Sequence, residues 1–169
     1  RYFRAGADKV SIGSDAVNAA ASLIAAAAAK GPNTLLTDAS LKTGKSSIEQ
    51  ISNQYGAQAV VVSVDPRRAF IADDKRKAEH EAQGHTVFDA PDDASTPSGM
   101  QYMWYQCTVR GGREGSAIGA VQLGKAVQAL GAGELLCNCV NADGQKAGFE
   151  LPLLRALSEA VSIPVIASS

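Results

Sequence analysis

The chain has 169 residues, with 16 Lys and Arg against 17 Asp and Glu, a formal net charge of −1, and 46% hydrophobic residues. This balance excludes a general nucleic-acid binder, which carries a basic excess, and a wholly disordered chain, which contains fewer apolar residues. No uninterrupted apolar stretch approaches the ~18 residues that a membrane-spanning helix needs, so we expect neither nucleic acid nor membrane as a partner.

The first part of the chain predicts helices alternating with apolar strands. In chain order we expect a strand over residues 8–12, a helix over about 16–29, a helix from about 46 to 56, and a strand over 59–65. Ser14 or Asp15 is the expected N-cap of the first helix, and Ser46 or Ser47 begins the second. The strand over 59–65 is apolar almost throughout, which is typical of a strand buried on both faces of a parallel sheet.

The middle of the chain is charged and poor in aliphatic residues. Residues 66–97 are interpreted as a solvated loop or insertion, which includes His80 and His85. Residues 68–72 and 102–109 alternate and are rich in aromatic or branched side chains, so they predict a two-stranded excursion from the main sheet. The charged insertion as a whole covers about residues 66–112.

The last part of the chain returns to alternating helices and strands. In order we expect a helix over about residues 116–130, a strand over 135–140, a polar loop over 141–148, a helix over 151–161 and a strand from 164. Strands that alternate with helices favour parallel βαβ units, so the predicted fold class is α/β.

Three cysteines, Cys107, Cys137 and Cys139, favour a reducing compartment because an odd number cannot pair fully within the chain. We interpret them as buried thiols that act as small hydrophobic residues, since no metal-ligand spacing connects them to either histidine. The cysteines therefore predict no metal site, and we expect no organic cofactor either. The chain starts without Met and stops inside an apparent strand, so we expect it to be a fragment of a longer protein.

Several segments resemble, in order, the cyclase barrel of the imidazole glycerol phosphate synthase family of histidine biosynthesis. They are residues 6–12 (GADKVSI), 59–65 (AVVVSVD), 131–136 (GAGELL), 143–144 (DG) and 163–169 (IPVIASS). The sequence also resembles the eukaryotic form of the family at residues 2–6 (YFRAG), 104–108 (WYQCT) and 111–114 (GGRE). That form is a multifunctional enzyme in which a glutamine amidotransferase domain precedes the cyclase. The resemblance implies that residues 1–169 are a fragment of one barrel domain, a partial (β/α)8 TIM barrel with about strands four to seven.

The resemblance gives Asp65 a catalytic role. Asp65 ends the longest apolar strand, and reacting groups of such barrels lie at the carboxyl ends of strands, where a partly desolvated carboxylate serves as general acid or base. From the residues alone, a turn or cap before Pro66 explains it equally well. The family uses two aspartates for ring closure, and Asp65 matches the second.

The family's substrate carries a phosphate at each end, which implies two cradles. Gly13 and Ser14, between a strand and a helix N-terminus, match one cradle, while Ser168 and Ser169 belong to the other. Asp143 and Gly144 match a loop that faces the substrate, although Asn141 and Ala142 stand where members often carry an acidic and a basic residue. Plain capping or turn roles remain open for these positions. Further polar residues in apolar strands are candidates for substrate contact or for satisfied core groups: Ser11, Ser63 and Asn138.

Asp8, Lys9 and Glu134 lie near the amino ends of their predicted strands, where ordinary surface ion pairing is the simple interpretation. The resemblance implies instead that Lys9 and Glu134 belong to a charged ring through which ammonia enters from the glutaminase. Asp8 would face that partner.

The function implied is that of a lyase that combines ammonia from glutamine with a bisphosphorylated ribotide in histidine biosynthesis. The expected partners are a glutaminase domain or subunit, fused upstream in the eukaryotic form, together with the ribotide and ammonia. The expected compartment is the cytoplasm, with a plastid as the alternative. Two other functions stay open: the sister phosphoribosyl isomerase of the same pathway, and a non-catalytic barrel that binds sugar phosphates.

Overall fold

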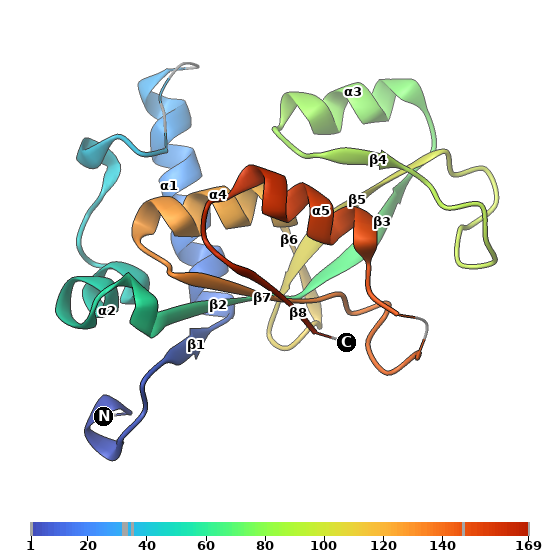
Figure 1. The fold of residues 1–169 in the computed structure, drawn as a ribbon. Coiled ribbons are helices and arrows are strands. Elements are labelled where there is room, and N and C mark those ends of the chain that lie inside the picture. Colours follow the sequence, from blue (N-terminus) through green and yellow to red (C-terminus); the bar gives the residue numbers. More distant parts are fainter. Residues whose placement is uncertain (1, 32–33, 35, 147, 169) are drawn as a thin grey trace.

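Four parallel strands form the sheet that organises the structure, a computed structural model that describes residues 2–31, 34, 36–146 and 148–168 (Figure 1). In spatial order they are β1 (Val10–Ile12), β2 (Val60–Val64), β7 (Glu134–Asn138) and β8 (Val165–Ser168). Each strand pairs in parallel with its neighbours. The predicted α/β class and all four parallel strands are confirmed.

Helices cover one face of this sheet and leave the other without a helical layer (Figure 1). The helices are α1 (Ser14–Lys30), α2 (Ser47–Tyr55), α4 (Ala120–Leu130) and α5 (Leu151–Ala160). Val60, Val62 and Val64 are fully buried against the helices, whereas Val61 and Ser63 on the opposite face of β2 are only partly buried. The alternation follows from the two-residue period of a strand. We call the second face the open face.

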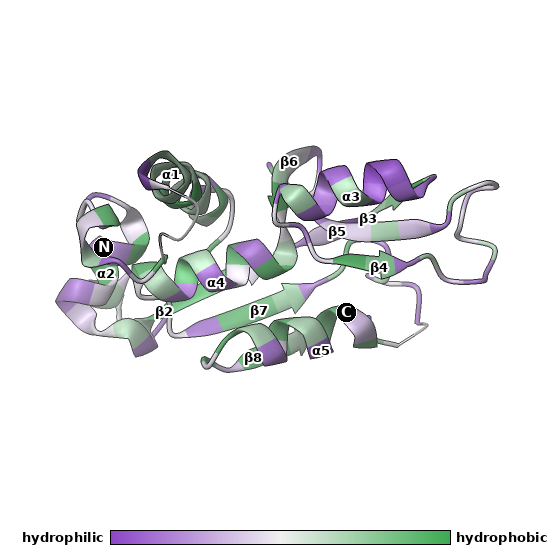
Figure 2. Ribbon diagram, turned by 90° about the horizontal axis from the view of Figure 1, so that it is seen from above, coloured by the Kyte–Doolittle hydropathy of each residue, from purple (hydrophilic) through white to green (hydrophobic). Residues whose placement is uncertain are grey.

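The order of strands and helices is that of consecutive units of a (β/α)8 barrel. Neighbouring strands are parallel. Helix α1 follows β1, α5 follows β7, and α4 follows the long segment that comes after β2. The helices and the sheet share one hydrophobic core. That core appears in Figure 2 as green on β7 and on the side of α4 that faces it. The structure is therefore a partial barrel, as the sequence predicts. No helix among the described residues is long and apolar enough to cross a membrane.

A second, antiparallel sheet projects beyond the carboxyl end of β2 (Figure 1). Its strands are β3 (Pro66–Ile71), β4 (Val87–Asp89), β5 (Tyr102–Val109) and β6 (Glu114–Gly119), with β5 pairing with the other three. The pairing of β3 with β5 confirms the predicted two-stranded excursion. Three short 3-10 segments complete the structure: Phe3–Ala5, Ala39–Leu41 and Ala57–Ala59.

The interpretation of residues 66–97 as a solvated loop is wrong, because this segment contains β3, β4 and the helix α3 (Asp74–Ala82). The helix has no buried residue and is strongly hydrophilic (Figure 2), so no apolar stripe signals it. Polar contacts hold it instead. Asp73 caps its first turn by accepting from the Arg76 amide at 2.9 Å, and the Lys77 ammonium lies 4.4 Å from the Tyr102 ring centre.

The two histidines lie in an aromatic cluster, with His80 on α3 and His85 in the short loop between α3 and β4. The Nδ1 atoms of His80 and His85 are 2.8 Å apart, and the His85 ring stacks on Trp104 with centroids 4.0 Å apart. The Nε2 of His85 lies 2.9 Å from the carbonyl oxygen of Ala117, to which it donates. The sequence predicts a strand at Trp104. It does not predict the contacts of Trp104 with His80 and His85, because these residues are too far away in the sequence for a local pattern to reveal them.

Two predicted helix starts need correction. The helix predicted from residue 116 begins at Ala120, because Glu114–Gly119 pairs with β5 and the Gln122 side chain accepts from the Gly119 amide at 3.0 Å. The cap of α1 is Gly13 and not Ser14 or Asp15, both of which lie inside the first turn. The start of α2 is as predicted, with Ser46 in a capping box with Glu49.

All three cysteines are free and buried, as predicted. Cys137 is 3% exposed on the helix-covered face of β7, and burial raises the pKa of its thiol to about 12. Burial likewise raises the pKa of Cys107 and of Cys139. A thiol that stays protonated is a poor nucleophile and metal ligand, so these side chains serve the core.

Candidate active site

Asp65 lies directly after β2, at the carboxyl edge of the parallel sheet and on the open face. The Ser63 hydroxyl, two residues earlier on the same face, lies 2.9 Å and 3.0 Å from its two carboxylate oxygens. The Thr108 hydroxyl on β5 donates to the Asp65 backbone carbonyl at 2.6 Å. The carboxylate is partly buried, and both its side chain and its backbone are held in place.

Asn138 lies beside Asp65 on the neighbouring strand β7, and Ser168 lies one strand farther, on β8. Val64 pairs with Cys137, so Asp65 lies level with Asn138, which in turn pairs with Ser168. The side-chain oxygen of Asn138 is buried and has no hydrogen-bond partner among the described residues. An unpaired buried acceptor costs about 1–3 kcal/mol, so this oxygen is suited to a donor from a bound molecule.

Ser11 is also on the open face but farther from the carboxyl edge. Ser11 pairs with Val61, which precedes Ser63 by two residues on β2 and pairs with Glu134 on β7. Ser11 is therefore two residues farther than Ser63 from the carboxyl edge of the sheet. A step of two residues along a strand is about 6.6 Å. The structure therefore does not bring Ser11 next to Asp65. Ser169 lies outside the described residues.

Gly13 and Ser14 occupy the turn between β1 and the N-terminus of α1. A Cβ added to Gly13 would meet no atom within 4 Å, so the turn is open to a ligand. The Ser14 hydroxyl accepts from the Arg110 backbone amide at 2.9 Å, which joins the β5–β6 turn to the helix start. Free amides at a helix N-terminus suit an anionic group, and the family resemblance implies a phosphate there.

Asp143 and Gly144 lie on the loop between β7 and α5, and both are exposed. The Asp143 amide donates to the Cys139 carbonyl at 3.0 Å, and Gly144 has a φ of 70°, in the left-handed region that favours glycine. The loop begins at the same edge of the sheet as Asp65. No contact joins the Asp143 and Asp65 side chains among the described residues.

Lys9 and Glu134 form an ion pair at the opposite, amino edge of the sheet. Glu134 begins β7, while Lys9 immediately precedes β1, so the pair spans β2 across the open face. The Lys9 side chain is 47% exposed and that of Glu134 is 19% exposed. Asp8, beside Lys9, is exposed. The predicted residues thus separate into two groups, one at each edge of the sheet.

The sequence did not single out three residues that connect this site to the antiparallel sheet. Arg68, Tyr105 and Glu150 form a largely buried polar cluster between β3, β5 and the start of α5. A pocket of about 900 Å³ lies beside the cluster and is lined by all three, but not by Asp65. The only local signal was the charged residue Glu150 at the start of a predicted helix. Its partners Tyr105 and Arg68 are 45 and 82 residues away in the sequence.

Metal chemistry receives no support from the side chains that the structure places. Across residues 2–31, 34, 36–146 and 148–168, no group of three or more His, Cys, Asp or Glu is arranged to hold a metal ion. What the open face offers is a fixed carboxylate, an unpaired amide oxygen and an open helix N-terminus.

The sequence of the chain is similar to those of known proteins over nearly its whole length. A family model described as "Histidine biosynthesis protein" matches residues 36–169. Imidazole glycerol phosphate synthase hisHF, chloroplastic, from Arabidopsis thaliana is 49% identical over 99% of this chain and 25% of its own length. The synthase hisHF of Schizosaccharomyces pombe is 45% identical over 99% of the chain and 27% of its own length. Subunit HisF from Halobacterium salinarum is 36% identical over 98% of the chain and 45% of its own length. The chain thus spans from a quarter to under half of these relatives.

Proposed function

The chain belongs to the histidine biosynthesis protein family, and we propose that it carries part of the cyclase barrel of an imidazole glycerol phosphate synthase. The arrangement at the carboxyl edge carries this proposal: Asp65 lies level with the unpaired buried oxygen of Asn138, on adjacent parallel strands. Adjacent strands are about 4.8 Å apart, so one small substrate group can reach both side chains. We further propose that residues 1–169 belong to one barrel domain, with the antiparallel sheet as its insertion.

The proposed reaction is a ring closure of the lyase type. Ammonia combines with phosphoribulosyl-formimino aminoimidazole carboxamide ribotide to give imidazole glycerol phosphate, aminoimidazole carboxamide ribotide and one water, which carries away the oxygen of the ribulosyl carbonyl. Asp65 transfers protons during cyclisation, together with a second aspartate on another strand of the whole barrel. Ser63 orients the carboxylate, Asn138 accepts from the substrate, and Asp143 and Gly144 contact it from the loop.

In this proposal the N-terminus of α1 binds one phosphate of the substrate. The free amides around Gly13 and Ser14 attract one phosphate of the ribotide, because amide hydrogens and the helix dipole both favour an anion there. Ser168 at the end of β8 contributes to the site of the second phosphate. Ser11 lies lower on the open face and lines the route between the two edges of the sheet.

Ammonia is proposed to enter at the amino edge, past Lys9 and Glu134. A glutaminase domain or subunit, expected upstream on the same polypeptide, supplies the ammonia, and Asp8 faces it. Passage through a closed barrel interior keeps ammonia unprotonated and away from bulk water. The proposed location is a plastid or the cytoplasm; the Arabidopsis relative is named chloroplastic.

The test is turnover of the ribotide by the complete protein with ammonium as the nitrogen source. The proposal predicts formation of imidazole glycerol phosphate, detected by chromatography and mass spectrometry. Isomerisation of the precursor ribotide in place of cyclisation identifies the sister isomerase. Tight binding of the ribotide without turnover, with and without ammonium, identifies a non-catalytic sugar-phosphate-binding barrel.

A further inference from the structure

We propose that Arg68 and Glu150 are positioning residues that hold the loop between β7 and α5 against the segment that carries Asp65. The inference deepens the proposed function and rests on it. We call the pair, together with Tyr105, the clamp. None of its three side chains belongs to the groups assigned above to catalysis, phosphate binding or ammonia entry.

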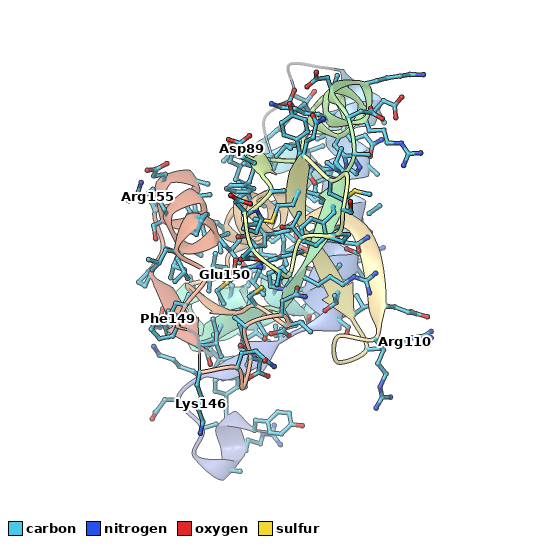
Figure 3. The ribbon with its side chains drawn as sticks, turned by 90° about the vertical axis from the view of Figure 1, so that its right-hand side faces the viewer. Asp89, Arg110, Lys146, Phe149, Glu150 and Arg155 are labelled. Carbon is cyan, nitrogen blue, oxygen red and sulfur yellow. The ribbon has the colours of Figure 1, made fainter. Side chains whose placement is uncertain are left out.

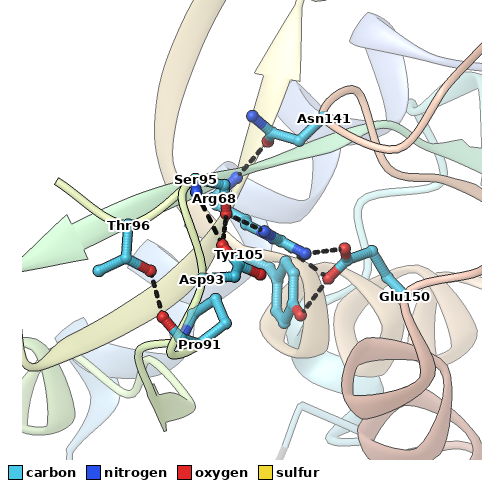
Figure 4. Close-up of polar contacts among 8 residues, drawn as sticks. All are labelled: Arg68, Pro91, Asp93, Ser95, Thr96, Tyr105, Asn141 and Glu150. Carbon is cyan, nitrogen blue, oxygen red and sulfur yellow. Dashed lines mark hydrogen bonds and ion pairs between the residues drawn. The ribbon is translucent and has the colours of Figure 1, made fainter. Parts of the chain in front are cut away.

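Arg68 connects three segments that are distant in sequence (Figure 4). Its backbone amide donates to the side-chain oxygen of Asn141 at 2.7 Å. Its guanidinium donates to the Ser95 hydroxyl at 2.7 Å and to both carboxylate oxygens of Glu150. A planar guanidinium that binds both oxygens of one carboxylate fixes orientation as well as distance.

Glu150 has a position that would suit a helix cap, but it does not cap α5. It stands at the N-cap of that helix and makes no side-chain bond to the first turn. Its carboxylate instead accepts from Arg68 and, at 2.6 Å, from the Tyr105 hydroxyl. The Arg68 side chain is 18% exposed and that of Glu150 is 9% exposed. Removing either partner leaves a largely buried charge unpaired, so the two depend on each other.

The ionisation of the cluster agrees with this geometry. Burial acts to lower the pKa of Arg68, but the hydrogen bonds and charge of Glu150 outweigh it and raise that pKa. Burial and the adjacent Glu150 carboxylate raise the pKa of the Tyr105 hydroxyl far above its usual value. Arg68 therefore stays a guanidinium and Tyr105 stays a neutral phenol throughout the physiological range.

Both ends of the loop that contains Asp143 and Gly144 are fixed, the start by backbone groups of β3 and the end by the side chains of the clamp. At its start, the Val140 amide donates to the Pro66 carbonyl at 2.9 Å, next to the Arg68–Asn141 bond. At its end, Glu150 is bound by Arg68 and Tyr105. Fixing both ends of a short loop removes most of its conformational freedom. Because Pro66 directly follows Asp65, these bonds also fix the position of the loop relative to the Asp65 carboxylate.

The kinetic test uses Arg68→Met, Glu150→Met and the double variant in the complete protein, with ammonium as the nitrogen source. We expect the KM for the ribotide to rise about 10- to 100-fold in each single variant, with a smaller change in kcat, because misplacing contact groups weakens binding. The double variant should be less impaired than the product of the two single effects, since neither charge is left unpaired. The matched controls are Arg155→Met (Figure 3) and Glu159→Met, both at exposed positions of α5.

In Figure 3 Arg155 and Lys146 lie at the edge of the molecule, while Glu150 lies nearer its middle. The controls remove one positive and one negative charge from exposed positions of α5 without touching the clamp. They should leave KM within about twofold of the unchanged protein, as expected of exposed substitutions. An unchanged KM in Arg68→Met and Glu150→Met, or strictly multiplicative effects in the double variant, would overturn the positioning role.

A second measurement does not depend on activity. Amide hydrogen exchange should become faster at residues 140–150 in both single variants, with exchange in β2 and β7 unchanged. Unchanged exchange in that loop, or equal loosening of the loop and the parallel strands, overturns the clamp. If the unchanged protein does not cyclise the ribotide, the proposed function fails, while the exchange measurement still decides whether the clamp exists.

Discussion

The hydroxyl of Ser63 lies 2.9 Å and 3.0 Å from the two carboxylate oxygens of Asp65, which places both side chains on the open face of β2. The arrangement follows from the strand itself, because residues two apart share a face. Val62 and Val64 between and beside them are completely buried under the helices. The hydrophobic core therefore fixes the direction in which the carboxylate points.

Replacing Ser63 should disturb the orientation of the carboxylate without unfolding the protein. Ser63→Ala removes the hydroxyl donor and leaves a small side chain, so we expect kcat for ammonium-dependent cyclisation to fall about tenfold, as a misplaced catalytic group does. Ser63→Thr keeps the hydroxyl and should retain most of the rate. Equal rates for all three proteins, measured under saturating ribotide, would show that Ser63 does not orient Asp65.

The ion pair between Lys9 and Glu134 should matter little for stability. Exposed pairs contribute about 0–1 kcal/mol, and the Lys9 side chain is 47% exposed. Lys9→Met should therefore change the free energy of unfolding by less than about 1 kcal/mol. The proposed ammonia route predicts that glutamine-supported product formation falls much more than ammonium-supported formation. Equal losses with the two nitrogen sources would remove Lys9 from that route.

The histidine cluster predicts a loss of stability on mild acidification. Burial lowers the pKa of His85, and the nearby His80 adds to this effect against the opposing hydrogen bond to Ala117. The unfolded chain, with an ordinary histidine pKa of about 6.5, then binds protons that folded His85 does not. Stability should be full above pH ~6.5 and should decrease as the pH falls below it.

The measurement is the thermal midpoint of the complete protein between about pH 7.5 and pH 5, a range above the ordinary pKa values of carboxylates. His85→Gln is the control, because it removes the titrating group and should flatten the dependence. A midpoint that stays constant in the unchanged protein, or one that falls equally in His85→Gln, would contradict this role of the cluster.

Two glycines should differ in how strongly they respond to alanine. A Cβ on Gly133 would lie 2.2 Å from the Ala57 backbone carbonyl oxygen, a contact that backbone atoms cannot relieve by a rotamer change. We expect Gly133→Ala to cost about 1–3 kcal/mol, the usual range for overpacking. Gly13→Ala meets no atom within 4 Å, so it should cost less, at most about 1 kcal/mol from the poorer N-cap preference of alanine. A similar stability for both variants in urea would refute the close approach at Gly133.

The parallel sheet was predictable because its strands are short apolar runs between helices. Residues 59–65 and 135–140 have this character, and their carboxyl ends must meet at one edge of a parallel sheet. This rule alone places Asp65 and Asn138 at the same edge, as found. The side-chain bond from Ser63 to Asp65 also follows from the period of the strand.

The antiparallel segment was predicted only in part, since its stability does not come from apolar periodicity. Helix α3 has no buried residue, and β6 follows a turn in a segment whose residues also suit a helix. The clamp was missed for a different reason. Arg68 and Glu150 are 82 residues apart, and no local pattern reports a contact over such a separation.

The most direct test of the account is ammonium-dependent cyclisation by the complete protein carrying Asp65→Asn. The amide matches the carboxylate in shape but cannot carry the proton, so folding and ribotide binding should be preserved while kcat falls by at least about 100-fold, the usual contribution of a general acid or base. Formation of imidazole glycerol phosphate at a near-normal rate by Asp65→Asn would contradict the central role given to this carboxylate.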